Sequence, residues 1–292
     1  MALNLLNLSI LFFLLFIVNP FPFVEPRALQ LPVFTKTLQN LRGVHKGQKA
    51  NGVGELRSYL QHFGYLTNGD SSNDNFDNNV ESALKHYQEF NHLRSTGVVD
   101  DETIKRMSLP RCGMPDIVTQ PNANQLLVAP NNYSFFPGQP KWRKFALTYG
   151  HMSSVVLSNN FFSSVRAAKL RALQTWARVT NFTFTERAPP ADIVYGFHRG
   201  DHGDGYPFDG PYGVLAHAFA PQNGRCHYDA DEPWDFNGQN IDFETVALHE
   251  CGHLLGLGHS NTRGSVMEAT YAGQRRSLTQ DDIDGIRALY QF

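Results

Sequence analysis

One segment near the C-terminus constrains this chain more than any other part of the sequence. It contains His249, Glu250 and His253 in close succession, followed by Gly256 and His259. Positions four apart lie on one face of a helix, so the imidazoles of His249 and His253 can meet at a single point. Gly256 lets the helix end and the chain turn back, which brings His259 to the same point. The segment therefore predicts a helix, a sharp turn and three histidines around one metal ion.

This arrangement of donors indicates a particular chemistry. Three neutral nitrogen donors that leave one position open are typical of catalytic zinc. Zinc supplies Lewis-acid chemistry, and Glu250, offset by one position from the ligands, is placed to take a proton from an attacking water. An amphipathic helix that merely carries histidines is the alternative, and the extension to Gly256 and His259 argues against it. Met267, eight residues beyond His259, predicts a methionine turn that gives the metal an apolar floor.

The first residues of the chain differ in composition from the rest. The stretch from Leu5 to Val18 is almost wholly apolar, and prolines follow it as far as Pro26. The run is short for a membrane span and lies where the apolar part of a secretory signal belongs. We therefore expect residues 1–26 to be a signal peptide, with an uncleaved anchor as the alternative. The last residues form no hydrophobic tail that would specify a lipid anchor.

In an exported chain, cysteines can form disulfide bonds and asparagines can be glycosylated. The three cysteines are Cys112, Cys226 and Cys251, so at least one thiol is unpaired or forms an intermolecular bond. Asn132 and Asn181 each begin an N-glycosylation sequence. The formal net charge of −2, without a basic stripe, argues against a nucleic-acid partner.

Two segments with helical periodicity lie between residues 38 and 107. Apolar side chains recur at helix spacing over Val53–Phe63 and again over Val80–Phe90. The stretch between them, Thr67–Asn79, is rich in Asn, Asp, Gly and Ser and is typical of a loop. These patterns predict a small helical module.

A linker and a larger mixed region follow the helical module. Residues 117–140 are rich in Pro, Asn and Gln, which is typical of a linker open to proteases. Beyond it, strand patterns over 144–149 and 192–197 flank an amphipathic helix over 161–179. This order predicts a mixed sheet backed by a helix. The segment 199–240, rich in Gly, Asp and His, predicts a long loop that depends on bound metal for rigidity.

A second motif surrounds the first cysteine and reads Pro110-Arg111-Cys112-Gly113-Met114-Pro115-Asp116. Together with the histidine segment, it resembles the matrix metalloproteinases, a branch of the metzincin zinc proteases. The resemblance covers nearly everything from Val53 to the C-terminus. Cys112 is similar to the cysteine switch of that family, in which a propeptide thiol takes the fourth zinc position and excludes water. The family usually has valine where Met114 stands.

The resemblance implies a domain organisation and a fold. Residues 38–116 are expected to form an all-helical propeptide, similar to a peptidoglycan-binding-like fold, that ends in the cysteine switch. Residues 117–140 are then the activation region, and residues 141–292 the catalytic domain. The expected fold class is α+β, a zincin-like domain with a twisted mixed sheet and three main helices. Among the family, minimal plant members without a haemopexin domain are the most similar.

The resemblance also implies metal and substrate sites between residues 199 and 240. A closed structural zinc site is expected from three histidines and a carboxylate: His202, Asp204, His217 and His227. A calcium site is expected from side-chain and backbone oxygens: Asp209, Gly210, Tyr212, Val214, Asp229 and Glu232. Leu215 and Ala216 are expected to lie on an edge strand that pairs with an extended peptide substrate.

Two departures from the family pattern affect these sites. Glu268 and Ala269 stand where the family usually has Tyr-Pro, beside the pocket for the substrate side chain just after the scissile bond. The Glu268 carboxylate either alters the preference of that pocket or points to solvent. Tyr212 replaces a glycine in the expected calcium loop, where a turn that glycine tolerates freely becomes strained.

The sequence thus predicts a secreted zinc endopeptidase, made as a zymogen, in the extracellular space or the cell wall. Its expected partners are protein substrates and its own propeptide, with no stable membrane anchor and a monomeric state. A catalytically impaired relative that binds peptides or protein partners is the first alternative. A wall- or glycan-binding protein that uses the helical module is the second.

Overall fold

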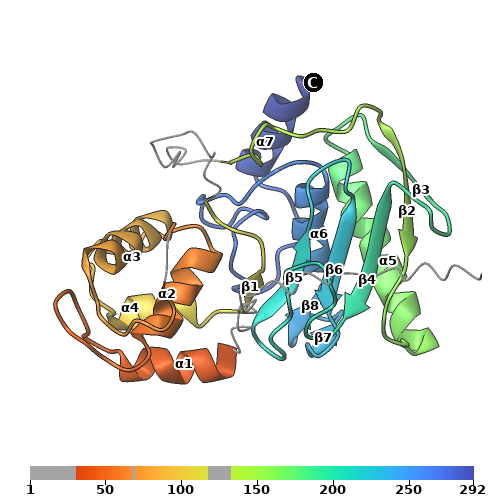
Figure 1. The fold of residues 1–292 in the computed structure, drawn as a ribbon. Helices are drawn as coiled ribbons and strands as arrows, with labels where there is room; N and C mark the ends of the chain where they lie inside the picture. The colour runs from red at the N-terminus through yellow and green to blue at the C-terminus, as the bar shows by residue number, and fades with distance from the viewer. Residues whose placement is uncertain (1–30, 68–69, 118–132) are drawn as a thin grey trace, which may run out of the picture.

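A computed structural model describes residues 31–67, 70–117 and 133–292 of the chain (Figure 1). The expected signal peptide, most of the expected linker and Asn132 lie outside the described residues. A helical module, orange in Figure 1, lies beside a larger module, green to blue, that contains the main sheet. Among the described helices, none combines the length and the apolar character that crossing a bilayer requires.

The N-terminal module is helical, as the periodicity predicts. Its helices within residues 31–117 are α1 (Leu31–Asn40), α2 (Val53–His62), α3 (Asn78–Phe90) and α4 (Asp101–Met107). The side chain of Asp77 caps α3 by accepting from two backbone amides, and Asp100 caps α4 in the same way. The apolar faces of the helices meet in one core that includes Leu56, Leu60 and Leu84. Helix α1 includes residues that precede the expected boundary at residue 38, and Phe34 among them packs into the core of this module.

The larger module is built on a mixed, six-stranded sheet with the order β1-β5-β6-β4-β2-β3. The strands are β1 (Arg111–Cys112), β2 (Ala146–His151), β3 (Thr183–Glu186), β4 (Ile193–His198), β5 (Val214–Ala218) and β6 (Arg225–Asp229). The β5–β6 pair is antiparallel, and the other pairs are parallel. The short strands β7 (Trp234–Asp235) and β8 (Ile241–Asp242) pair separately.

Helices α5 (Asn159–Ala177) and α6 (Phe243–Leu254) pack together on one side of this sheet, and α7 (Gln280–Tyr290) lies at one end (Figure 1). Helix α5 is amphipathic and buries Val165, Ala168 and Trp176 in the core. The indole nitrogen of Trp176 donates to the carbonyl of Leu248 at 2.9 Å, which fixes α5 against α6. All of α6 is buried, so its polar side chains are held inside the protein. The α+β fold class expected from the sequence is confirmed.

The segment 199–240 differs from the long loop that its composition predicts, because it contains strands β5, β6 and β7. Every residue of β5 is buried, so the strand shows no alternation of apolar and polar residues. His217 and His227 lie within β5 and β6, and their polar side chains disguise both strands. Only β5 is buried along its whole length, whereas β6 begins with the exposed Arg225. The prediction of a loop was therefore wrong for these residues.

The two modules are joined through the sheet. Strand β1 belongs to the segment that follows the helical module, and it pairs in parallel with β5 at the edge of the sheet. The amide of Arg111 donates to the carbonyl of Gly213 at 3.0 Å, and the amide of Gly113 donates to the carbonyl of Ala216 at 2.8 Å. The expected all-helical propeptide therefore also contains a short extended segment.

Candidate metal centres and active site

Helix α6 and the turn after it bring three histidines together. His249 and His253 are on α6, and His259 follows a turn at Gly256, which has φ of 107°. A side chain at Gly256 would place its Cβ 2.5 Å from the carbonyl oxygen of Pro140, so only glycine fits this turn. Ligand atoms of the three histidines and of Cys112 all lie within 4.8 Å of one another.

The hydrogen bonds of these imidazoles fit a metal ion. The Nδ1 atoms of His249 and His253 donate to the carbonyls of Val266 and Leu257, at 2.7 and 2.8 Å. Burial lowers the pKa of His249 to about 3 and that of His253 well below its ordinary value, so both rings are neutral. A neutral ring that donates from Nδ1 has a bare lone pair on Nε2. The two Nε2 atoms lie 3.0 Å apart, and a cation between them would satisfy both lone pairs.

The third histidine supports the same conclusion. Nδ1 of His259 contacts the carboxylate of Asp116 at 2.8 Å, and its buried Nε2 has no hydrogen-bond partner within the described residues. Orientation of each ligand through its second nitrogen is the usual device of histidine metal sites. The donor set of three nitrogens and one thiol suits zinc.

Glu250 lies on α6 between the first two histidines, and its side chain is fully buried. Burial raises the pKa of Glu250 to about 8, while the Cys112 thiol and the Lys169 ammonium group oppose that rise. Within the described part of the chain, no donor lies at the distance and angle of a hydrogen bond to either carboxylate oxygen of Glu250. A carboxylate held in this way can accept a proton at neutral pH.

Met267 is fully buried and packs against helix α6. A Cβ added to Gly252 on α6 would lie 2.2 Å from the sulfur of Met267, so the two residues pack in close contact. The carboxylate of Asp282 holds this turn, accepting from the hydroxyl of Ser265 and from the amide of Met267 at 2.6 and 3.2 Å. Sequence reasoning missed that role of Asp282, because the same residue also completes the capping box of α7.

Cys112 reaches the histidines from β1, on the segment that follows the helical module. Its sulfur lies 3.4 Å from Nε2 of His253, and its amide donates to the carbonyl of Ala269 at 2.9 Å. Burial and the neighbouring Glu250 raise the pKa of the Cys112 thiol. A zinc ion held by these histidines would reverse that effect, because coordination favours the thiolate.

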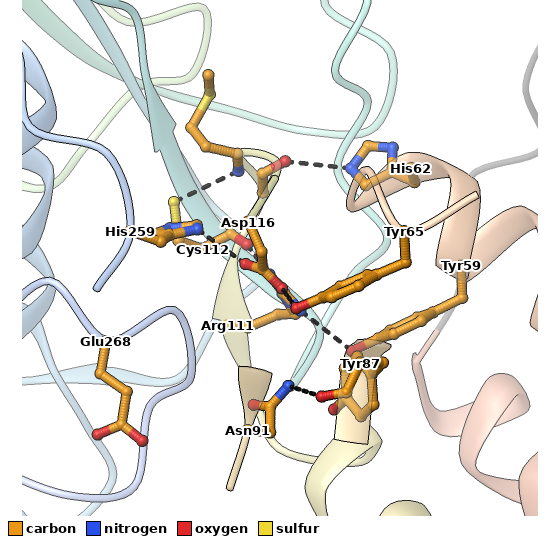
Figure 2. Close-up of polar contacts among 12 residues, drawn as sticks. Tyr59, His62, Tyr65, Tyr87, Asn91, Arg111, Cys112, Asp116, His259 and Glu268 are labelled. Carbon is orange, nitrogen blue, oxygen red and sulfur yellow. Dashed lines mark hydrogen bonds and ion pairs between the residues drawn. The ribbon is translucent and has the colours of Figure 1, made fainter. Parts of the chain in front are cut away.

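A buried ion pair holds the cysteine segment in place (Figure 2). Arg111 pairs with Asp116, and both side chains are about 1% exposed. The guanidinium group lies over the ring of Phe63, 3.3 Å from its centroid, and the hydroxyl of Tyr65 donates to Asp116 at 2.7 Å. Arg111 and His259 lower the pKa of Asp116 below its ordinary range although burial opposes them, so its carboxylate is ionised. Figure 2 shows Asp116 lying among Arg111, Tyr65 and His259.

The second histidine cluster lies in the segment between β4 and β6. Ligand atoms of four residues lie within 4.8 Å of one another: His202, Asp204, His217 and His227. One oxygen of Asp204 contacts nitrogens of His202, His217 and His227 at 3.1, 2.8 and 2.7 Å. Burial lowers the pKa of His217 to about 4, so its ring is neutral and able to bind a metal. This donor set fits a closed zinc site.

The expected calcium ligands form a separate loop beside β5. The carboxylates of Asp209, Asp229 and Glu232 are all buried. Burial raises the pKa of Asp229 to about 6 and that of Glu232 to about 7. Among the described residues, these carboxylates do not converge as closely as the two histidine clusters do.

Backbone amides of the same loop point at the carboxylates. The amide of Val214 donates to Asp209 at 2.7 Å, and the amide of Tyr212 donates to Glu232 at 2.9 Å. Tyr212 has φ of 65°, the left-handed conformation that its replacement of glycine predicts to be strained, and its ring is exposed. The loop is therefore built around negative charge.

A small cavity of about 30 Å³ opens beside the first histidine cluster. Cys112, His249 and Glu250 line one side of it, and Leu215 of β5 lines another. Leu215 and Ala216 lie on the strand whose edge β1 covers. Glu268 and Arg275 also line the cavity, and sequence reasoning did not identify Arg275.

The remaining residues singled out in the sequence are separate from these sites. Cys226 and Cys251 are free, buried thiols within the core of the larger module. Asn181 is exposed at the surface.

Comparisons with known proteins agree with this architecture. The profile of the family described as Matrixin matches residues 141–291, and that of a putative peptidoglycan binding domain matches residues 49–107. Metalloendoproteinase 5-MMP from Arabidopsis thaliana is 42% identical over 275 residues, 87% of this chain and 75% of the relative. Metalloendoproteinase 1 from Glycine max is 41% identical over 260 residues, 84% of each chain. Matrilysin from Homo sapiens is 38% identical over 258 residues, 83% of this chain and 89% of the relative.

The resemblance to metalloproteinases that the two sequence motifs indicate is thus confirmed. A family profile covers more than half of the chain, and relatives at about 40% identity cover most of its length. The buried histidine clusters provide donor sets that suit the zinc on which such enzymes depend. The chain belongs to the matrixin family and is a zinc metalloendopeptidase.

Proposed function

We propose that this enzyme is a secreted zymogen, kept inactive by the thiol of Cys112. Residues 38–116 then form the propeptide, residues 117–140 the region that is cut, and residues 141–292 the catalytic domain. The observation that carries the proposal is the convergence of Cys112 with His249, His253 and His259 inside 4.8 Å. Secretion rests on the apolar run within residues 1–26.

The proposed chemistry assigns a role to each residue of the first cluster. His249, His253 and His259 hold zinc, which supplies Lewis-acid activation of a peptide carbonyl and of water. Glu250 accepts the proton of the attacking water and then delivers it to the departing amine nitrogen. The raised pKa of Glu250 suits both steps, since the carboxylate must bind a proton and release it near neutral pH. Met267 keeps the ligands in place from below.

Latency follows from the geometry of the cysteine segment. The thiol of Cys112 fills the place that water and substrate need, and β1 covers the edge of β5 that an extended peptide would use. Leu215 and Ala216 become available to a substrate only when this segment leaves. The ion pair between Arg111 and Asp116 keeps the segment folded until the chain is cut.

The other proposed sites are structural. His202, Asp204, His217 and His227 hold a second zinc ion, and calcium is bound by the loop that contains Asp209, Gly210, Tyr212, Val214, Asp229 and Glu232. The carboxylates of Asp209, Asp229 and Glu232 are buried near one another and accept from backbone amides, and a bound cation would offset the cost of ionising several buried carboxylates in one place. Asn132 and Asn181 are the proposed glycosylation sites, and the substrates are proteins outside the cell.

Cleavage of a quenched peptide library by the purified full chain, before and after limited proteolysis between Asp116 and Lys141, tests the proposal. We expect activity only after trimming, and none with a zinc chelator or with Glu250→Ala. Cys112→Ser is expected to give activity without trimming, while thermal melting verifies that it folds. Folded, zinc-loaded protein that stays inactive after trimming would support the impaired, peptide-binding alternative instead.

A further inference from the structure

Glu268 lies at the boundary between the two modules and has a different partner on each of its oxygens. One oxygen, Oε1, pairs with the guanidinium group of Arg106 at the end of α4. The other oxygen, Oε2, lies 2.9 Å from Nη2 of Arg275 and accepts from the amide of Gly264 at 3.2 Å. The Glu268 side chain is only 9% exposed. The carboxylate therefore joins a fixed cation of the larger module to a cation of the helical module.

The two arginines are held in different ways. Arg275 is held within the larger module, because its Nη1 donates to the carbonyls of Ser265 and Thr270 at 3.2 and 3.5 Å. Arg106 is attached to the helical module, where its Nε donates to Asn91 at 2.8 Å. Removal of residues 38–116 takes Arg106 away and leaves Arg275 in place. Oε1 of Glu268 then loses its partner, while Oε2 keeps both of its own.

Glu268, which carries this oxygen, is part of the wall of the substrate pocket. Glu268 lines the same cavity as Glu250, His249 and Cys112. The apolar part of its wall includes Leu215, Val246 and Val266. Once Arg106 has left, this oxygen is open to a ligand, and a cationic donor placed against it in the pocket would form a charge-assisted hydrogen bond. A lysine or arginine side chain supplies an apolar stem for the wall and a cationic head for the oxygen.

We propose that Glu268 is a cation subsite of the substrate pocket, which selects a basic side chain next to the scissile bond. Arg106 occupies this subsite in the uncut chain and thereby stands in for the substrate cation. This inference rests on the proposed function, because Arg106 must leave with the propeptide. It turns the departure from the family pattern at Glu268 into a determinant of specificity.

Binding of two fluorescent peptides tests the subsite directly. They are identical except for lysine or its uncharged analogue norleucine at the positions flanking the scissile bond, and the protein is full chain carrying Glu250→Ala, trimmed after purification. We expect the lysine peptide to bind about tenfold more tightly, and Glu268→Gln to reduce that ratio to about one. Glu244→Gln, which removes an equally buried carboxylate on α6 outside the pocket, is expected to leave the ratio unchanged.

The same ratio in kcat/KM, measured with Glu250 intact, separates this inference from the proposed function. Lysine preference in binding without any cleavage would leave the subsite standing and overturn the catalytic proposal. If the trimmed protein with Glu268 intact binds the two peptides equally, or binds the norleucine peptide more tightly, the subsite is overturned. That comparison does not depend on the folding of any Glu268 variant. A ratio unchanged by Glu268→Gln in folded, zinc-loaded protein would overturn it as well.

Discussion

The two histidine clusters use similar donors but differ in where the fourth donor comes from. In the first cluster, three histidines come from α6 and the turn after it, and Cys112 comes from a segment that precedes the larger module. In the second, His202, Asp204, His217 and His227 all lie between β4 and the end of β6. The first set is completed by the segment that leaves the enzyme in the proposed zymogen mechanism, whereas the second set is complete within one short stretch.

The fourth donors, Asp204 and Cys112, also differ in how they contact the histidines of their clusters. Asp204 contacts all three histidines of its cluster through one oxygen, so its removal would leave a group of nitrogens without an acceptor. The sulfur of Cys112 lies 3.4 Å from Nε2 of His253 and also accepts from the amide of Met114 at 3.4 Å, and main-chain pairing to β5 and Ala269 holds the residue there. Under the proposed mechanism, the site that opens on activation takes its last donor from the propeptide, and the structural site takes it from the same short stretch as its histidines.

The largest expected effect separates catalysis from metal binding. Glu250→Gln removes the proton acceptor of the first cluster without removing a ligand, so activity of the trimmed enzyme should fall about 10²- to 10⁴-fold. Zinc content, measured by elemental analysis, should stay the same. Glu244→Gln on the same helix is the matched control and should retain activity. Loss of one zinc equivalent in Glu250→Gln would show that the residue acts as a ligand instead.

Asp204→Asn should break the second cluster and leave the chemistry of the first in place. The substitution removes the negative charge that three nitrogens share, and loss of a buried pair of this kind costs about 3–5 kcal/mol. We expect one zinc equivalent fewer per chain and a large decrease in melting temperature. Asp201→Asn is the control, because Asp201 is a neighbouring exposed residue whose side chain accepts from the amide of Gly203. Unchanged stability and zinc content would contradict a structural role for the cluster.

Removal of calcium should destabilise the protein more at alkaline than at acidic pH. Burial raises the pKa of Asp229 to about 6 and that of Glu232 to about 7, above the values of these groups in an unfolded chain. Without a cation, the stability that these groups contribute is present below pH 4 and is lost as pH rises through 6 to 7. A bound cation offsets the cost of ionising them, so the gain in melting temperature on adding calcium should grow from pH 5 to pH 8. A gain that shrinks over this range would contradict the assignment.

A smaller effect is expected at the junction of the modules. Arg106→Gln removes the cation that pairs with Glu268 and should weaken retention of the propeptide by about 1 kcal/mol, or roughly fivefold. The measurement is the rate at which peptide-cleaving activity appears during limited proteolysis. Arg94→Gln, an exposed position in the helical module, is the control. Equal activation rates for both variants and the parent chain would show that this pair does not contribute to latency.

The sequence predicts local patterns well and distant pairs poorly. The helices around Leu60, Leu84 and Trp176 follow from apolar periodicity, and the first metal cluster follows from spacing along one helix and its turn. The strand β5 escapes prediction because it is buried on both faces and carries a histidine. The pair of Arg106 and Glu268 joins residues far apart in the chain and has no local signal.

The roles of Asp282 and Arg275 were missed for a related reason. The position of Asp282 at the start of α7 is explained by capping, yet its carboxylate also holds the turn of Met267. Arg275 lies in an irregular stretch, and only the folded chain brings it to Glu268 and to the pocket. Residues that serve two elements at once are therefore the ones that sequence patterns conceal.

X-ray absorption at the zinc edge tests the central claim most directly, since it detects sulfur bound to the metal. With both clusters loaded, the uncut chain should show zinc–sulfur scattering at about 2.3 Å from one sulfur for every two zinc ions. Trimming between Asp116 and Lys141 should abolish that signal, and Cys112→Ser should abolish it without trimming. Absence of sulfur in the uncut chain, or its persistence after the propeptide has been removed, would contradict the account.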